Sequence, residues 1–142
     1  MTTKSYQELI EDRIFIGGAD DVMNIMENES VDVVVDLRAE SLNTSSDSNR
    51  VHSPIVDDAE QQEESVKEAI NLVVNAYNDG KKVFFHCGGG SNRTGTVAIG
   101  TLLALGKADT IAEAEETAKT IRPKINVKSA MRDSLKRIFP DA

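Results

Sequence analysis

The sequence predicts a single α/β domain spanning residues 1–142, with a central, mainly parallel sheet of about four to five strands flanked by helices. Short runs of β-branched and aromatic residues, typical of buried parallel strands, alternate with longer segments of helical apolar spacing. The length of 142 residues is that of one ordinary domain, which buries its own core without disulfides or metals.

Three strands are expected in the first two thirds of the chain, at residues 14–16, 31–37 and 82–86. Between the second and third of them, apolar side chains from Val66 to Tyr77 recur at helical spacing, and Asp79-Gly80 supplies a stop. This stretch is therefore expected to be a β-helix-β crossover, which joins parallel strands.

Helices account for the rest of the chain. Residues 94–105 are almost wholly apolar, which predicts a helix buried under the sheet, and Gly106 stands where a C-terminal cap belongs. Residues 110–113 match a capping box that opens a helix ending before Pro123. Apolar residues at helical spacing over 131–139 predict the final helix.

Composition and charge exclude several classes of function. A net charge of −8 argues against nucleic acid or an anionic membrane as a partner, and no apolar run approaches membrane-spanning length. The N-terminus lacks the apolar stretch of a secretory signal, and a single cysteine fits a reducing compartment. We therefore expect a cytoplasmic monomer, and the one cysteine, Cys87, must be explained by reactivity or by packing.

The run from His86 to Thr94 leaves a buried strand and enters an apolar helix. A phosphate dianion needs several converging donors, and a strand-to-helix turn supplies free backbone N–H groups and the positive end of the helix dipole. Consecutive glycines let the backbone curl around the anion, and the planar Arg93 guanidinium can hold two phosphate oxygens. The residues expected to bind phosphate are Gly88, Gly89, Gly90, Ser91, Asn92 and Arg93.

Cys87 is the candidate nucleophile in this turn. Helix N-termini and nearby cations hold a cysteine as its thiolate, the form that attacks phosphorus to give a phosphocysteine. The alternative is an inert, buried cysteine, which explains neither the glycines nor Arg93.

The same run resembles the signature His-Cys-x-x-Gly-x-x-Arg-Ser/Thr of the protein tyrosine phosphatase superfamily, specifically its compact dual-specificity branch, and every fixed position is present. The resemblance extends over nearly the whole chain. Residues 14–19 look like the opening strand, 35–38 like the next strand end, 54–57 like the general-acid loop and 121–123 like the late Arg-Pro element.

The resemblance implies a phosphatase that acts on phosphotyrosine and on phosphoserine or phosphothreonine, without metal or cofactor. It implies that Thr94 hydrogen-bonds the leaving sulfur and that His86 orders the loop from behind. It places the general acid at Asp57, with Asp58 as the alternative. Asp36, at a strand end, is expected to bond backbone rather than to act in catalysis.

Some residues carry two interpretations. Asn92 stands where the family usually has Gly or Ser, and it either contacts substrate or caps the helix. Arg122, Lys124 and Lys128 either ring the pocket and attract anionic substrate or lie on solvated helix ends.

Other functions compete with a protein phosphatase. Rhodaneses carry sulfur on a differently charged loop, and arsenate reductases on related loops relay through further cysteines, which this chain lacks. One alternative is a pseudo-phosphatase that binds phosphate without turnover. Another is an inositol phosphate phosphatase, although the loop contains no lysine to bind a highly charged inositol ligand. The expected partner is a phosphorylated protein or a small phosphomonoester.

Overall fold

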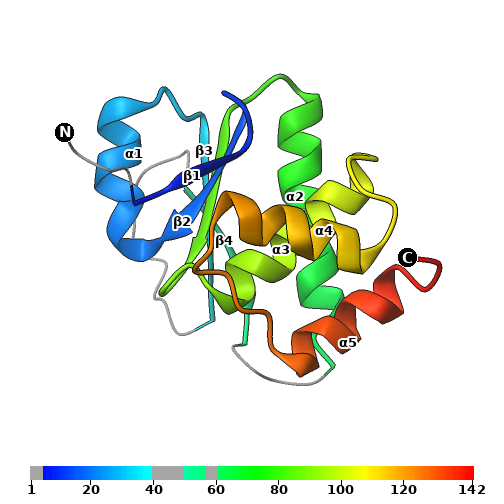
Figure 1. Cartoon of the computed structure of the whole chain (residues 1–142). Coiled ribbons are helices and arrows are strands. Elements are labelled where there is room, and N and C mark those ends of the chain that lie inside the picture. The colour runs from blue at the N-terminus through cyan, green and yellow to red at the C-terminus, as the bar shows by residue number, and fades with distance from the viewer. Residues whose placement is uncertain (1–4, 40–49, 57–60) are drawn as a thin grey trace.

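The computed structural model describes residues 5–39, 50–56 and 61–142, which form one mixed, mostly parallel sheet with helices on both faces (Figure 1). Within these residues the sheet has five strands in the order β1-β2-β5-β3-β4. Strands β2, β5, β3 and β4 run parallel, and β1 pairs antiparallel with β2 at one edge. The strands are β1 (Gln7–Ile10), β2 (Ile14–Gly18), β3 (Val33–Arg38), β4 (Arg50–Ile55) and β5 (Val83–Cys87).

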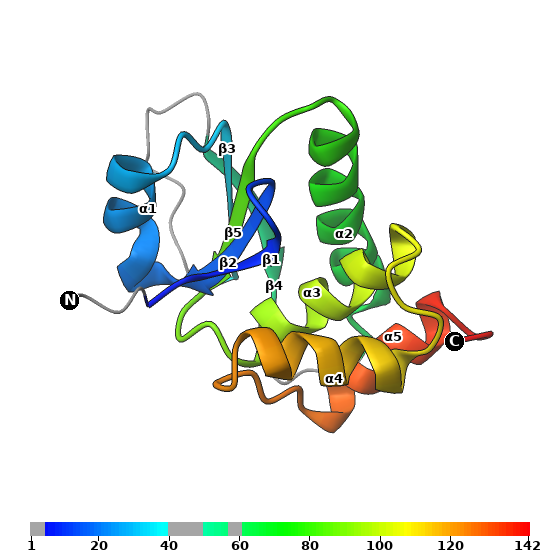
Figure 2. The same ribbon diagram turned by 45° about the horizontal axis from the view of Figure 1, so that its top comes forward.

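Helix α1 covers one face of the sheet, and helices α2 to α5 cover the other (Figures 1 and 2). The helices are α1 (Val22–Asn28), preceded by the short 3₁₀ turn η1 (Ala19–Asp21), α2 (Glu63–Asn78), α3 (Asn92–Ala104), α4 (Ile111–Ile121) and α5 (Ser129–Ile138). None of these helices is long and apolar enough to cross a bilayer. The predicted α/β class is confirmed.

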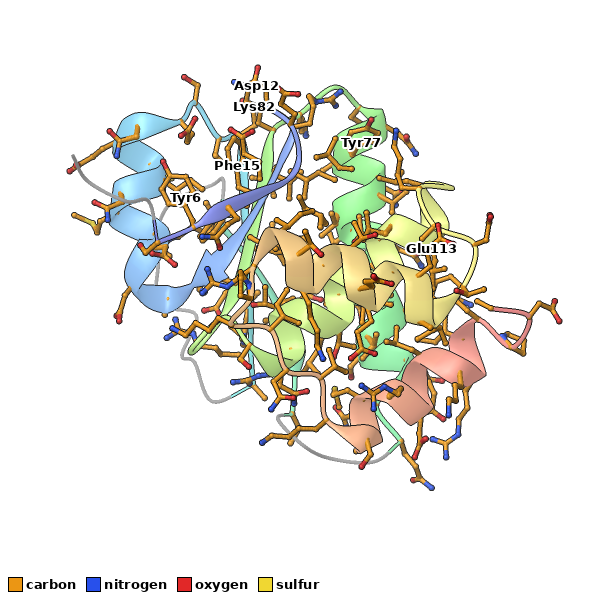
Figure 3. All side chains as sticks on the ribbon, viewed as in Figure 1. Tyr6, Asp12, Phe15, Tyr77, Lys82 and Glu113 are labelled. Carbon is orange, nitrogen blue, oxygen red and sulfur yellow. The ribbon has the colours of Figure 1, made fainter. Side chains whose placement is uncertain are left out.

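Each face of the sheet has its own core. On the α1 side, Phe15 and Phe84 pack with Ile25, and Tyr6 meets Phe15 edge to face at 6.2 Å between ring centroids (Figure 3). The larger core lies between the other face and α2 to α5. Strands β2 and β5 are buried at every position because both faces are covered, which explains their unbroken apolar runs.

Three elements were not predicted from the sequence. Strand β1 and helix α1 are short, with four and seven residues, and their apolar positions are too few to set a period. Strand β4 contains Pro54, which is tolerated because β4 lies at the edge of the sheet. The segment 54–57, matched to a general-acid loop, therefore begins inside a strand.

The helix ends follow the sequence signals. The side-chain oxygen of Thr110 accepts a hydrogen bond from the Glu113 N–H at 3.1 Å, as the capping pattern predicts, and α4 ends two residues before Pro123. Gly80 and Gly106 follow α2 and α3 with φ of 83° and 71°, the left-handed conformation that glycine adopts without strain. These stops fix where α2 returns to the sheet and where α3 turns into α4.

Candidate active site

The loop after β5, which we call the cysteine loop (residues 87–93), lies at the carboxyl end of a central strand. Strand β5 ends at Cys87, α3 begins at Asn92, and Cys87 pairs with Gly18 at the end of β2. The Ala19 N–H donates to the Gly88 carbonyl at 3.0 Å, which ties this loop to the start of η1. Ligands of parallel sheets bind at this edge, so the cysteine loop is the candidate active site.

Cys87 is held by Thr94 in the first turn of α3. The sulfur is buried, with the residue 3% exposed, and the Thr94 hydroxyl oxygen lies 3.1 Å from it. The same oxygen accepts the Cys87 N–H at 3.0 Å and lies 3.2 Å from the Gly17 carbonyl oxygen. Thr94 therefore fixes both the backbone and the sulfur of the cysteine.

Arg93 lies beside the start of the loop and is only 4% exposed. Its Nη1 donates to the Ile55 carbonyl at 3.0 Å, which orients the guanidinium toward the end of β4. A Cβ built on Gly88 would lie 3.9 Å from Nη2 of Arg93, so the guanidinium faces the residue that follows the cysteine. A buried, oriented guanidinium is suited to bidentate binding of phosphate oxygens.

Gly90 is the position of the loop at which the backbone conformation requires glycine. Its φ is 71°, and a Cβ there would lie 2.5 Å from Nη2 of Arg122 and 2.7 Å from the Gly17 carbonyl. Gly88 and Gly89 have no such crowding. The loop therefore closes onto β2 and Arg122 through Gly90.

Arg122 is buried at 4% exposure, so the solvated helix end considered from the sequence is wrong for this residue. Its Nε donates to the Gly90 carbonyl at 2.8 Å, and its Nη2 lies 3.4 Å from the Gly89 carbonyl. Its Nη1 donates to the Ser5 carbonyl and to Oε1 of Gln7, both at 2.6 Å.

These contacts set the direction of the loop's peptide groups. Burial lowers the pKa of the Arg122 guanidinium, while the charges of Asp21 and Cys87 act in the opposite direction. The C=O and N–H of a trans peptide point in opposite directions. Because the Gly89 and Gly90 carbonyls face Arg122, the N–H groups of the same peptides point away from it, free to bind an anion. In the sequence, Arg122 was singled out by the match to the Arg-Pro element and as one of three basic residues considered for the rim of the pocket.

Asn92 neither caps α3 nor is solvated. The N-cap position is Ser91, and the Asn92 side chain is buried, with Oδ1 accepting the Lys128 N–H at 2.8 Å. One turn on, a Cβ at Gly95 would lie 2.6 Å from Cγ2 of Ile125. The segment before α5 thus packs closely on the first turn of α3, and Asn92 joins the two.

His86 lies beneath the loop. It is 2% exposed and stacks on Phe84 with ring centroids 5.5 Å apart, while Nδ1 lies 3.2 Å from the Cys87 carbonyl oxygen. Burial lowers the pKa of His86, so the imidazole is neutral at pH 7.

Three carboxylates were considered from the sequence, and one of them, Asp36, lies in the described part of the chain. Asp36 accepts the Arg38 N–H and pairs with the Arg38 side chain, both at 3.0 Å, which is the structural role expected for a strand end. Asp57 and Asp58 lie outside the described residues. Within 5–39, 50–56 and 61–142, no cluster of three or more His, Cys, Asp or Glu side chains is placed to hold a metal.

A cysteine, a glycine cradle and a buried arginine at the carboxyl edge of a parallel sheet are the features of the protein tyrosine phosphatase superfamily. Residues 14–138 match the family model described as dual specificity phosphatase, catalytic domain. The chain therefore belongs to the dual specificity phosphatase family.

Solved structures extend the comparison to nearly the whole chain. Tk-PTP in its active form aligns with a TM-score of 0.80 and 22% identity over 99% of this chain and 100% of its own. Human DUSP28 gives 0.78 and 16%, over 96% and 93% of the two chains. PTPMT1 in complex with PI(5)P gives 0.80 and 17%, over 96% and 95%. At these identities the likeness establishes the fold. No curated protein is significantly similar in sequence.

Proposed function

We propose that the protein is a cysteine-dependent phosphomonoester hydrolase, acting as a dual-specificity protein phosphatase on phosphotyrosine and on phosphoserine or phosphothreonine. The observation that supports this most is the placement of Cys87, Thr94 and Arg93 around one strand-to-helix turn. In this proposal residues 1–142 act as one domain, monomeric and cytoplasmic, without metal or cofactor.

In the first step the Cys87 thiolate attacks phosphorus, an S–P bond forms, and the P–O bond to the substrate breaks. Arg93 and the N–H groups of residues 88–93 hold the three non-bridging oxygens, and their grip tightens as charge develops. The leaving oxygen takes a proton from an acid, which we assign to Asp57, with Asp58 as the alternative.

In the second step water attacks the phosphocysteine, the S–P bond breaks, and inorganic phosphate and the thiolate are released. The carboxylate that gave up its proton in step one accepts a proton from this water. The Thr94 hydroxyl, 3.1 Å from Sγ, stabilises the sulfur as negative charge returns to it. His86 supports the loop without exchanging protons.

The test is phosphate release from an aryl phosphate by the purified full chain, beside Cys87→Ser. We expect turnover without added metal, unaffected by chelator and blocked by vanadate or thiol alkylation. Cys87→Ser should abolish turnover, and wild-type rates in that variant would disprove the mechanism. Binding of vanadate without any turnover by the wild-type protein would indicate the pseudo-phosphatase alternative.

A substrate panel then tests specificity. Phosphotyrosine, phosphoserine and phosphothreonine peptides should all be hydrolysed, with the peptides preferred over soluble inositol phosphates. Turnover of inositol phosphates alone would replace protein phosphatase with inositol phosphate phosphatase as the function.

A further inference from the structure

A cavity of about 380 Å³ opens beside the cysteine loop. Four parts of the chain line it: the residues around the start of β1, the turn from β2 into η1, the loop glycines 88–89 and the segment after α4. We call this cavity the side groove. The segment after α4 runs alongside the cysteine loop in both views (Figures 1 and 2), consistent with the bonds from Arg122 to that loop.

Two charged side chains of the side groove are occupied in holding the structure. Asp21 is buried and accepts the Gly18 N–H at 2.8 Å and the Ser5 hydroxyl. Arg122 donates to backbone and to Gln7. Both side chains therefore already hold partners within the protein.

The other two charged side chains of the groove are available. Asp20 and Lys124 are exposed, and neither has a hydrogen bond or ion pair with any residue in the described part of the chain. The side groove therefore presents one carboxylate and one ammonium to a ligand.

The groove adjoins the phosphate cradle directly. Gly88 and Gly89 belong to both, and a Cβ built on Gly89 would have no atom within 4 Å. The φ of Gly89 lies outside the left-handed region, and the space that a side chain would occupy there is empty. A substrate whose phosphate sits in the loop has room to continue along this side.

We propose that the side groove is a subsite for the polypeptide next to the phosphorylated residue, in which Lys124 selects an acidic and Asp20 a basic flanking side chain. A polyphosphorylated inositol would bring only negative charge to a groove in which the exposed carboxylate of Asp20 lies alongside Lys124, on a protein of net charge −8. A peptide carrying both signs of charge complements the groove. This inference rests on the proposed phosphatase activity and names the substrate class.

The experiment compares kcat and KM for an aryl phosphate and four phosphotyrosine peptides with neutral, acidic, basic or mixed flanks. The variants are Lys124→Glu, Asp20→Lys and the double reversal. Lys107→Glu and Asp109→Lys are matched controls, because these exposed residues follow the far end of α3 and carry the same change in net charge. All are measured at low and high salt, since exposed charge pairs weaken with ionic strength.

For the peptide with acidic flanks, Lys124→Glu should raise KM roughly fivefold with little change in kcat, as expected for an exposed charge contact. Asp20→Lys should raise KM for the peptide with basic flanks by a similar factor. The double reversal should exchange the residues that select the acidic and the basic flanking side chains. Aryl phosphate turnover should be unchanged in all variants. Charge selectivity that follows the substitutions is an effect that altered folding would not produce.

Three results would overturn the inference. Equal effects of Lys124→Glu and Lys107→Glu would indicate general charge attraction in place of a subsite. Unchanged peptide preference in the double reversal would show that neither Lys124 nor Asp20 selects the substrate. Faster turnover of inositol phosphates, taken from the substrate panel above, than of every peptide would show that phosphopeptides are not the substrate class. If the wild-type protein fails to hydrolyse even the aryl phosphate, the proposed function itself is wrong. The aryl phosphate measurement thus separates failure of the proposed function from failure of the subsite.

Discussion

The hydroxyl of Thr94 lies 3.1 Å from the sulfur of Cys87 and 3.2 Å from the carbonyl oxygen of Gly17. A hydroxyl has one proton, so it donates to only one of these two acceptors at a time. A thiolate carries a full charge and competes well against a carbonyl, whereas a sulfur bonded to phosphorus does not. The Thr94 proton is thus expected to turn to Gly17 in the phosphocysteine and back to sulfur as the S–P bond breaks.

Thr94→Ala should therefore slow the second chemical step more than the first. Hydrogen bonds to charged groups are worth about 1.5–3 kcal/mol, which corresponds to a loss of roughly 10- to 100-fold in phosphocysteine hydrolysis. Rapid-mixing kinetics with an aryl phosphate should show a burst of the aryl alcohol equal to the enzyme concentration. Thr94→Ser keeps the hydroxyl and should show wild-type kinetics. Absence of a burst in Thr94→Ala, with turnover near that of wild type, would contradict this role.

The Arg122 contacts predict a loss of both stability and activity on substitution. Arg122→Met leaves the buried Gly90 carbonyl without its donor, which costs about 1–3 kcal/mol, and it also removes the partly buried bonds to Gly89, Ser5 and Gln7. We expect urea denaturation to give an unfolding free energy lower by several kcal/mol, with a lower kcat/KM below the transition. Arg132→Met is the control, because its ion pair with Glu115 is partly exposed and worth at most about 1 kcal/mol. Equal losses of unfolding free energy and of kcat/KM in the two variants would show that the Arg122 contacts to the cysteine loop have no special role.

Arg122 also illustrates the limit of the sequence. The cysteine loop was predictable because its residues are contiguous and each type has a local reason, from the free N–H groups at the start of α3 to the left-handed φ of Gly90. Arg122 is distant in sequence from the loop that it contacts, and no local pattern separates a buried arginine from a solvated one. Asn92 is ambiguous for the same reason, since its partner is the N–H of Lys128.

The fold shows the same division. The central strands were predictable because both faces are buried, so their sequences are continuously apolar. Strand β4 lies at an edge, is half exposed and contains Pro54, so its pattern is that of a loop. Its position depends on pairing with β3, which is a tertiary interaction.

The hydrogen bond from the Lys128 N–H to Asn92 predicts coupling between these two positions. Asn92→Ala removes the acceptor, and Lys128→Pro removes the donor at a residue whose φ of −79° suits proline. Each change should lower kcat/KM about tenfold and weaken inhibition by inorganic phosphate, because the first turn of α3 loses its tether. Lys128→Ala keeps the N–H and is the control.

A double-mutant cycle tests whether this one bond is responsible. The variant with both Asn92→Ala and Lys128→Pro should be no worse than either alone. Fully additive losses would mean that the two residues act separately.

Buried His86 predicts a dependence of stability on pH. Its pKa is lowered by burial in the folded protein, whereas in the unfolded chain it is near 6.5, so the unfolded state binds more protons below that value. The contribution of this group to stability is complete above about pH 6.5 and falls as pH decreases from there toward the folded-state pKa, with a limiting slope of about 1.4 kcal/mol per pH unit.

Urea denaturation at pH 7.5 and pH 5.5 measures this effect. Wild type should lose more unfolding free energy between the two pH values than His86→Gln, because the other titrating groups are common to both proteins. An equal pH dependence in wild type and His86→Gln would show that the buried imidazole does not contribute.

The choice of general acid gives the last prediction. Only the general acid must hold a proton in the first step, so Asp57→Asn should lower kcat far more than Asp58→Asn on the acidic side of the pH profile, by roughly 10²- to 10⁴-fold for a phosphotyrosine peptide. An aryl phosphate with a strongly acidic leaving group needs less protonation and should lose much less. Asp58→Asn is the matched control, with the same change one residue away. If Asp58→Asn gives the larger, leaving-group-dependent loss, the acid is Asp58, and if neither does, the proton comes from another group.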